Sequence, residues 1–100
     1  NKLLFIDSYT SWCGPCKWFS ANVLTDASVA EMYNKNFINY KLDIEKHADG
    51  PGFANKYGVS SIPTLFFIDG TGKVISKQVG AQQKDSFLNW GRQMSEYSVN

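Results

Sequence analysis

The sequence lacks an excess of charge of either sign, and it lacks long apolar runs. Its 10 basic and 9 acidic residues leave a formal net charge of +1, and they are scattered instead of forming the basic stretch that binds nucleic acid or anionic lipid. Its apolar runs, such as Leu3–Ile6, are far shorter than the roughly 20 residues needed to span a bilayer. We therefore expect neither a nucleic-acid partner nor membrane insertion.

Cysteine is also scarce. Both cysteines, Cys13 and Cys16, lie in one tetrapeptide, whereas small secreted domains held together by disulfides are dense in cysteine. A bridge between these positions would close too small a loop to add much stability. Zinc binding also uses this spacing, but a tetrahedral site needs more ligands, and His47 is the single histidine. The pair therefore predicts redox chemistry that needs neither a metal nor an organic cofactor.

The chain is too short for more than one sizeable domain. A length of 100 residues, with 43% hydrophobic and 15% aromatic residues, is typical of one globular domain with an aromatic core. Because the chain begins at Asn1 with neither an initiator methionine nor an apolar leader, we expect a mature or excised fragment that forms a single domain over residues 1–100.

The hydrophobic pattern predicts an α/β protein. Continuous apolar residues in the first strand indicate that both of its faces are covered. Asp69–Gly72 between two apolar segments predicts a hairpin, so the second half is expected to be antiparallel. Strands are expected over 2–8, 37–44, 64–68 and 73–79, and helices up to about 22, from about 28, over 53–57 and from 84 onward.

Local signals refine three of the predicted helices. Thr25, Asp26 and Ser28 each offer an N-cap oxygen for the second helix, and Ser28 and Glu31 have the spacing of a capping box. Trp18 and Phe19 are both expected in the core. Gly91 would cost the last helix about 1 kcal/mol relative to alanine, unless close approach to the sheet requires it.

Pro15 locates the dithiol at the start of a helix. Proline is tolerated in the first turn, where its missing N–H would have no partner anyway, and this places Cys13 at the helix N-terminus. The free backbone N–H groups and the helix dipole should lower the pKa of the Cys13 thiol from about 8.5 toward about 7. Cys13 is the expected nucleophile. Cys16, further inside the helix and less exposed, is expected to resolve the mixed disulfide.

Four short motifs together resemble the thioredoxin family. Phe5–Asp7 precedes Trp12–Lys17, and Ile62–Thr64 and Val79–Ala81 follow in the family's order. The match covers nearly the whole chain. It implies the thioredoxin fold, a central mixed sheet of four or five strands flanked by helices, and the activity of a protein-disulfide oxidoreductase.

The resemblance also implies roles for individual residues. Ile62 and Pro63 would be joined by a cis peptide bond facing the dithiol, beside which an extended substrate segment pairs with the backbone, and Pro63 would exclude metal. Asp7 would be a buried acid that takes the proton of Cys16, with Lys41 as its partner. The positions expected to contact substrate are Trp12, Gly14, Pro15, Ile62, Pro63 and Gly80.

Considered without the resemblance, these residues have simpler interpretations. Pro63 could be an ordinary loop proline, Lys41 a solvated lysine at a strand edge, and Trp12 a side chain that packs over its loop. Asp7 in an apolar strand must be paired or protonated, and burial would raise its pKa.

The chain departs from typical thioredoxins in two places. It starts after the family's N-terminal strand and helix, and Phe19–Asn22 stands where the family has a helix-bending proline. The segment Asn22–Ala30 looks more like the thioredoxin-like domains of thiol-disulfide interchange proteins, including those of the bacterial cell envelope. A location in the cell envelope or periplasm is therefore favoured over the cytoplasm.

The expected function is the reduction or exchange of protein disulfides by a monomer. Its partners would be protein disulfide substrates and a protein that restores its thiols. By family analogy, Gly-Pro between the cysteines favours a reducing potential near about −270 mV. Three alternatives stay open, namely a redox-inert interaction module with the same fold, a metal-binding module that would hold zinc, and an electron-transfer domain dedicated to one partner.

Overall fold

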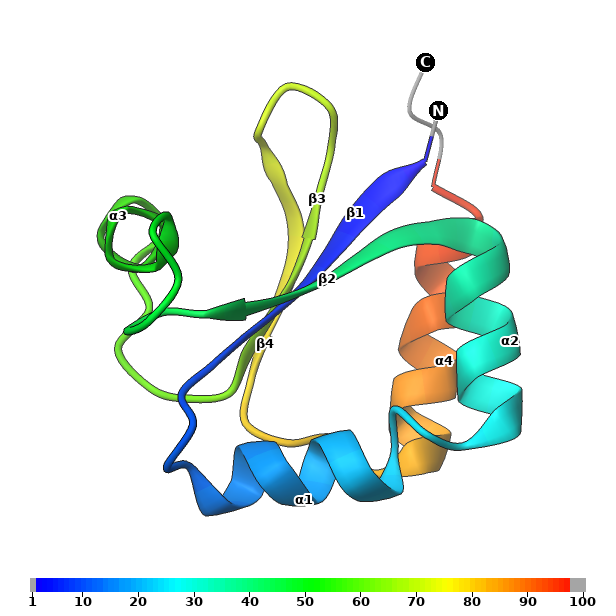
Figure 1. The fold of residues 1–100 in the computed structure, drawn as a ribbon. Helices are drawn as coiled ribbons and strands as arrows, with labels where there is room; N and C mark the ends of the chain where they lie inside the picture. Colours follow the sequence, from blue (N-terminus) through cyan, green and yellow to red (C-terminus); the bar gives the residue numbers. More distant parts are fainter. Residues whose placement is uncertain (1, 98–100) are drawn as a thin grey trace.

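Within residues 2–97, which are those described by the computed structural model, four strands form a mixed sheet with helices on both faces (Figure 1). The predicted α/β class and the predicted order of elements are confirmed. In chain order the elements are β1 (Leu3–Tyr9), α1 (Gly14–Asn22), α2 (Ala27–Asn36), β2 (Phe37–Asp43), α3 (Gly50–Tyr57), β3 (Thr64–Ile68), β4 (Val74–Val79) and α4 (Lys84–Ser95).

The strand order is β2-β1-β3-β4. β1 runs parallel to β2 and antiparallel to β3, and β3 and β4 form the predicted hairpin. Because β1 and β3 are central and covered on both faces, their sequences are almost continuously apolar. Asp7 interrupts β1 and lies beside Lys41 of β2 on one side and Leu65 of β3 on the other.

The larger core cluster lies between the sheet and helices α1, α2 and α4, and it is aromatic. Tyr33 of α2 stacks on Phe87 of α4 with ring centroids 4.1 Å apart, and its hydroxyl donates a 2.7 Å hydrogen bond to the Phe87 carbonyl. A smaller cluster on the opposite face includes Phe66 and is covered by Phe53 and Tyr57 of α3. None of the helices within residues 2–97 combines the length and apolar character needed to cross a membrane.

Three local predictions are corrected by the structure. The N-cap of α2 is Asp26, whose carboxylate accepts hydrogen bonds from the N–H groups of Ser28 and Val29, so Ser28 is not the cap. Trp18 is 40% exposed whereas Phe19 is fully buried, because neighbouring helical residues point about 100° apart and one side of α1 faces the core. α3 begins three residues earlier than expected, at Gly50 with Pro51 in its first turn.

Gly91 brings α4 close to α2. A Cβ at this position would lie 2.7 Å from Cε1 of Tyr33, so the close approach is to a helix and not to the sheet. Since the Tyr33 ring is held by its stack on Phe87 and by its hydroxyl, it has little freedom to move. Gly91→Ala is therefore expected to destabilise the fold by about 1–3 kcal/mol, although alanine alone favours a helix by about 1 kcal/mol.

Urea unfolding checks this prediction, with Gly52→Ala in α3 as the matched control. A Cβ at Gly52 meets nothing within 4 Å, so that variant should be as stable as the wild type or slightly more stable. If Gly91→Ala unfolds at the same urea concentration as Gly52→Ala, the contact with Tyr33 does not restrict this position.

Candidate active site

The dithiol lies where α1 begins. Cys13 is the N-cap of α1, and its sulfur accepts a 3.1 Å hydrogen bond from the N–H of Cys16. Pro15 occupies the first turn, as the sequence predicts. The two cysteine Cα atoms are 5.2 Å apart and the sulfurs are joined in a disulfide. In the reduced protein, the same N–H group and the helix dipole would stabilise a thiolate on Cys13.

The two cysteines are equally inaccessible in this disulfide form. Cys13 is 4% exposed and Cys16 is 5% exposed, so the prediction that Cys16 is the less exposed of the two is wrong here. The Cys13 sulfur lies 3.8 Å from the Ile62 carbonyl oxygen and is bonded to the Cys16 sulfur. The surroundings of the two cysteines nevertheless differ, because Cys16 lines a cavity of about 370 Å³ together with Lys17 and Ser20 of α1.

The loop before β3 meets Cys13. Ile62 and Pro63 are joined by a cis peptide bond, as the family resemblance implies, and the Ile62 carbonyl oxygen lies 3.8 Å from the Cys13 sulfur. The Pro63 carbonyl accepts a 2.8 Å hydrogen bond from the N–H of Gly80, which has a positive φ of 98°. Three predicted substrate positions, Ile62, Pro63 and Gly80, are thus brought together at the dithiol.

Trp12 is the most exposed large hydrophobic side chain among the described residues, at 66%. Its indole N–H donates a 2.9 Å hydrogen bond to Oε1 of Glu45. This bond holds the nitrogen edge of the indole in place, while the rest of the ring is exposed to solvent. Gly14 and Pro15 beside it are also exposed. Sequence reasoning missed Glu45. It could have been found from the parallel pairing of β1 and β2, since segments that follow parallel strands emerge at the same edge of a sheet.

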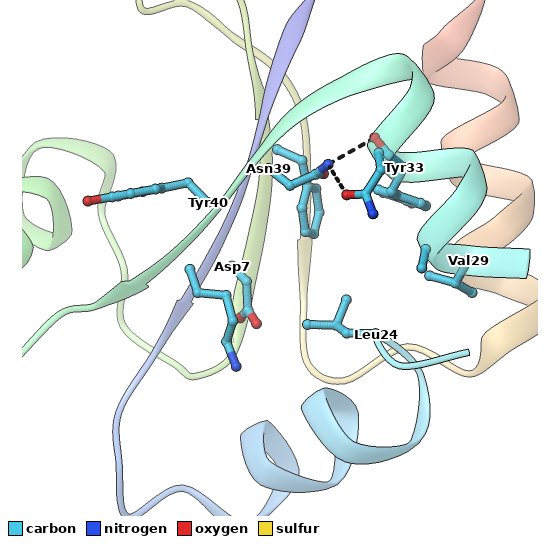
Figure 2. A pocket seen from close by; sticks show the side chains of 10 residues that line it. Asp7, Leu24, Val29, Tyr33, Asn39 and Tyr40 are labelled. Atoms are coloured by element: carbon cyan, nitrogen blue, oxygen red, sulfur yellow. Dashed lines mark hydrogen bonds between the residues drawn. The ribbon is translucent and has the colours of Figure 1, made fainter. Parts of the chain in front are cut away.

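Asp7 of β1 is buried in the interior of the protein. It is 1% exposed, and its Oδ1 has no hydrogen-bond partner among residues 2–97. Burial raises the pKa of Asp7 from 3.8 to about 6, and the positive charge of Lys41 opposes that rise. The carboxyl lines a cavity of about 160 Å³ between β1, β2 and α2, in which Figure 2 shows it pointing toward the space beside Leu24.

Lys41 is exposed on the edge strand β2, but its ammonium is not free in solvent. It donates a 2.7 Å hydrogen bond to the hydroxyl of Ser20 on α1 and lies 4.9 Å from the centre of the Tyr9 ring. Lys41 lines both the cavity of Asp7 and the cavity of Cys16. Its contact with Ser20 was not predicted, because nothing in the sequence relates two residues on different elements at this spacing.

Metal ligands do not gather elsewhere in the described part of the chain. Within residues 2–97, no three His, Cys, Asp or Glu side chains come together as a metal site would require. His47, the one histidine considered as a ligand, lies 3.1 Å from the Tyr40 hydroxyl, and its Nδ1 accepts a hydrogen bond from the N–H of Asp49.

Comparison with known proteins agrees with this arrangement. The family model of the thioredoxin-like domain matches residues 1–95. Thioredoxin-2 of Saccharomyces cerevisiae is 40% identical over 81 residues, which are 81% of this chain and 70% of the yeast protein. The thioredoxin of Borreliella burgdorferi is 38% identical over 91 residues, covering 89% of this chain and 70% of that protein.

Solved structures give the same result. A proposed disulphide-isomerase from Bacteroides thetaiotaomicron is 42% identical and superposes with a TM-score of 0.81, covering 98% of this chain and 80% of that one. A thioredoxin from Thermus thermophilus, at 21% identity, has a TM-score of 0.80 over 92% of this chain and 72% of its own, and it supports the fold alone. The fold and the Cys13–Cys16 pair define a thiol-disulfide oxidoreductase. The chain belongs to the thioredoxin-like domain family.

Proposed function

We propose that the protein reduces disulfide bonds in other proteins, with Cys13 as the attacking thiolate. The observation that carries this proposal is the position of the Cys13 sulfur, which caps α1 beside the Ile62–Pro63 loop. The thiolate attacks a substrate disulfide, an S–S bond forms between Cys13 and substrate, and the second substrate sulfur leaves as a thiolate that takes a proton.

Cys16 completes the reaction. Its thiolate attacks the Cys13 sulfur, the Cys13–Cys16 disulfide forms, and the remaining substrate sulfur leaves and is protonated. The substrate gains two electrons and the dithiol loses two. A partner that supplies electrons through its own thiols then restores Cys13 and Cys16.

Asp7 is proposed to take the proton that Cys16 must lose. A buried carboxyl with a pKa of about 6 is ionised in most molecules at neutral pH, yet it is basic enough to accept a proton. The transfer would proceed through water, and Lys41 would favour the ionised form of Asp7.

Substrate is proposed to bind over the surface around Cys13. An extended segment would add its backbone to the chain beside Pro63, while the exposed ring of Trp12 and the turn at Gly14 and Pro15 would contact its side chains. The N–H of Gly80 donates a hydrogen bond to the Pro63 carbonyl and so holds the segment after β4 against the Ile62–Pro63 loop. We propose that the protein acts as a monomer.

The reduction potential tests the proposed direction of the reaction. When the protein is equilibrated with defined ratios of reduced and oxidised glutathione, we expect a potential near about −270 mV, the value typical of thioredoxin. The same preparation should accelerate the reduction of insulin by dithiothreitol. A potential above about −150 mV would instead indicate an oxidant. No acceleration with both cysteines intact, combined with tight binding of a partner, would favour an interaction module.

A further inference from the structure

Lys41 lines two cavities that the proposed reaction uses. One, of about 160 Å³, contains the carboxyl of Asp7, and the other, of about 370 Å³, is lined by Cys16. Of the described residues, Lys41 is the one that lines both. Its ammonium is therefore placed to influence a proton that moves between the cysteine and the carboxyl.

The position of this ammonium depends on α1. A lysine on an edge strand has a long flexible side chain and loses up to about 2 kcal/mol of rotamer entropy when it is held in one place. Here its Nζ donates a 2.7 Å hydrogen bond to Ser20 and lies 4.9 Å from the ring centre of Tyr9. Ser20 lies four residues after Cys16, so the hydroxyl and the cysteine share one side of α1, and both line the same cavity.

We infer that Ser20 is a positioning residue, whose hydroxyl holds the Lys41 ammonium between the Asp7 cavity and the Cys16 cavity and so keeps Asp7 ready to take the proton of Cys16. This inference rests on the roles proposed above for Asp7 and Lys41. Ser20 itself touches neither substrate nor the reacting sulfur atoms.

The other titratable groups around Asp7 do not replace Lys41. Tyr33 of α2 lines the same cavity, but burial raises its pKa above the usual value, so it remains neutral. Figure 2 shows the ring of Tyr40 pointing away from Asp7, and on the other side β3 presents Leu65, which carries no charge. Lys41 is thus the cation of the Asp7 cavity.

Removal of the Ser20 hydroxyl should act on Asp7 through Lys41. Without that hydrogen bond, the side chain of Lys41 can turn into solvent, where water screens its charge. The pKa of Asp7 should then rise. The fold should not suffer, because Ser20 is only half-buried and alanine is a better helix former than serine. A purely structural role for Ser20 would therefore leave the titration of Asp7 unchanged.

The experiment is an NMR titration of the Asp7 carboxyl carbon in the full chain, together with the pH profile of mixed-disulfide resolution. Ser20→Ala should raise both apparent pKa values by about half a unit, as expected when a charge a few Å away becomes screened. Ser20→Thr, which keeps a hydroxyl, should titrate like the wild type. Ser11→Ala is the matched control, because Ser11 lines the Cys16 cavity but does not bond Lys41.

Lys41→Met distinguishes the possible outcomes. It should raise the Asp7 pKa at least as much as Ser20→Ala, and adding Ser20→Ala to it should have no further effect. If Lys41→Met shifts the titration and Ser20→Ala does not, the positioning role of Ser20 is wrong while the proposed function stands. If neither variant shifts it, the proposed partnership of Asp7 and Lys41 fails as well.

Discussion

Replacement of Cys13 by serine is expected to reduce the catalysed reduction of insulin to the rate measured without protein, whereas replacement of Cys16 should stop the reaction after its first step. Serine is a good N-cap residue, so Cys13→Ser should keep the start of α1 and remove only the thiolate. Cys16→Ser keeps the Cys13 sulfur at the N-cap, beside the Ile62 carbonyl. It should therefore still attack a substrate disulfide, and the mixed disulfide should accumulate because no second thiol resolves it.

Non-reducing electrophoresis and mass spectrometry of the covalent adduct check this result. Cys16→Ser should yield an adduct that dithiothreitol releases, and Cys13→Ser should yield little or none. The adducts would also identify the physiological substrates if the variant is expressed in its native cell. If instead Cys13→Ser accumulates the adduct and Cys16→Ser forms none, the assigned roles of the two cysteines are reversed.

Replacement of Asp7 by asparagine is expected to remove a large pH dependence of stability. The folded chain binds the Asp7 proton with a pKa of about 6, against 3.8 for an ordinary aspartate. Between these values the folded state holds more protons than the unfolded state, so the stability of the wild type falls as the pH rises from about 4 to about 6. The difference corresponds to about 3 kcal/mol. The asparagine variant has no such titration. Its free energy of unfolding, relative to that of the wild type, should therefore increase by that amount as the pH rises across this range.

Urea unfolding of the disulfide form at a series of pH values measures this gain. Asp69→Asn is a useful control, since hydrogen bonds from the Thr71 hydroxyl and backbone N–H groups lower the pKa of the exposed Asp69 carboxyl. The Asp69 carboxylate stabilises the wild type above the pKa that it has in the unfolded chain, and this stabilisation is lost as the pH falls. Its effect on stability therefore has the opposite pH dependence to that of Asp7.

Asp7→Asn should also slow the resolving step by about 10²-fold or more, as removal of a general base does. If the free energy of unfolding has the same pH dependence in Asp7→Asn and in the wild type, Asp7 does not titrate in this range.

The local features of the fold were the ones that the sequence predicted well. The position of the dithiol at a helix start follows from Pro15, and the hairpin follows from Asp69–Gly72, because each signal lies within a few residues of its effect. The helix that begins near Ser28 shows where even local reasoning is limited. Several side-chain oxygens near this position could cap the N-terminus of α2, and in the structure the carboxylate of Asp26 does so.

Contacts between elements could not be predicted in the same way. The hydrogen bonds from Trp12 to Glu45 and from Lys41 to Ser20 join residues 33 and 21 positions apart, and they exist only once the sheet has brought its strands and α1 together. Close approach at Gly91 was foreseen, but its neighbour was not, because the neighbour depends on how α4 crosses α2.

The capping sulfur of α1 ties the secondary structure of the protein to its oxidation state. The Cys13 sulfur accepts the hydrogen bond from the N–H of Cys16. The same sulfur forms or breaks a covalent bond in each step of the proposed disulfide exchange. An ionised acceptor makes a stronger hydrogen bond than a neutral one, so the first turn of α1 is held most firmly when Cys13 is a thiolate and less firmly when its sulfur is bonded to another sulfur. Each catalytic cycle thus loosens and tightens this end of α1.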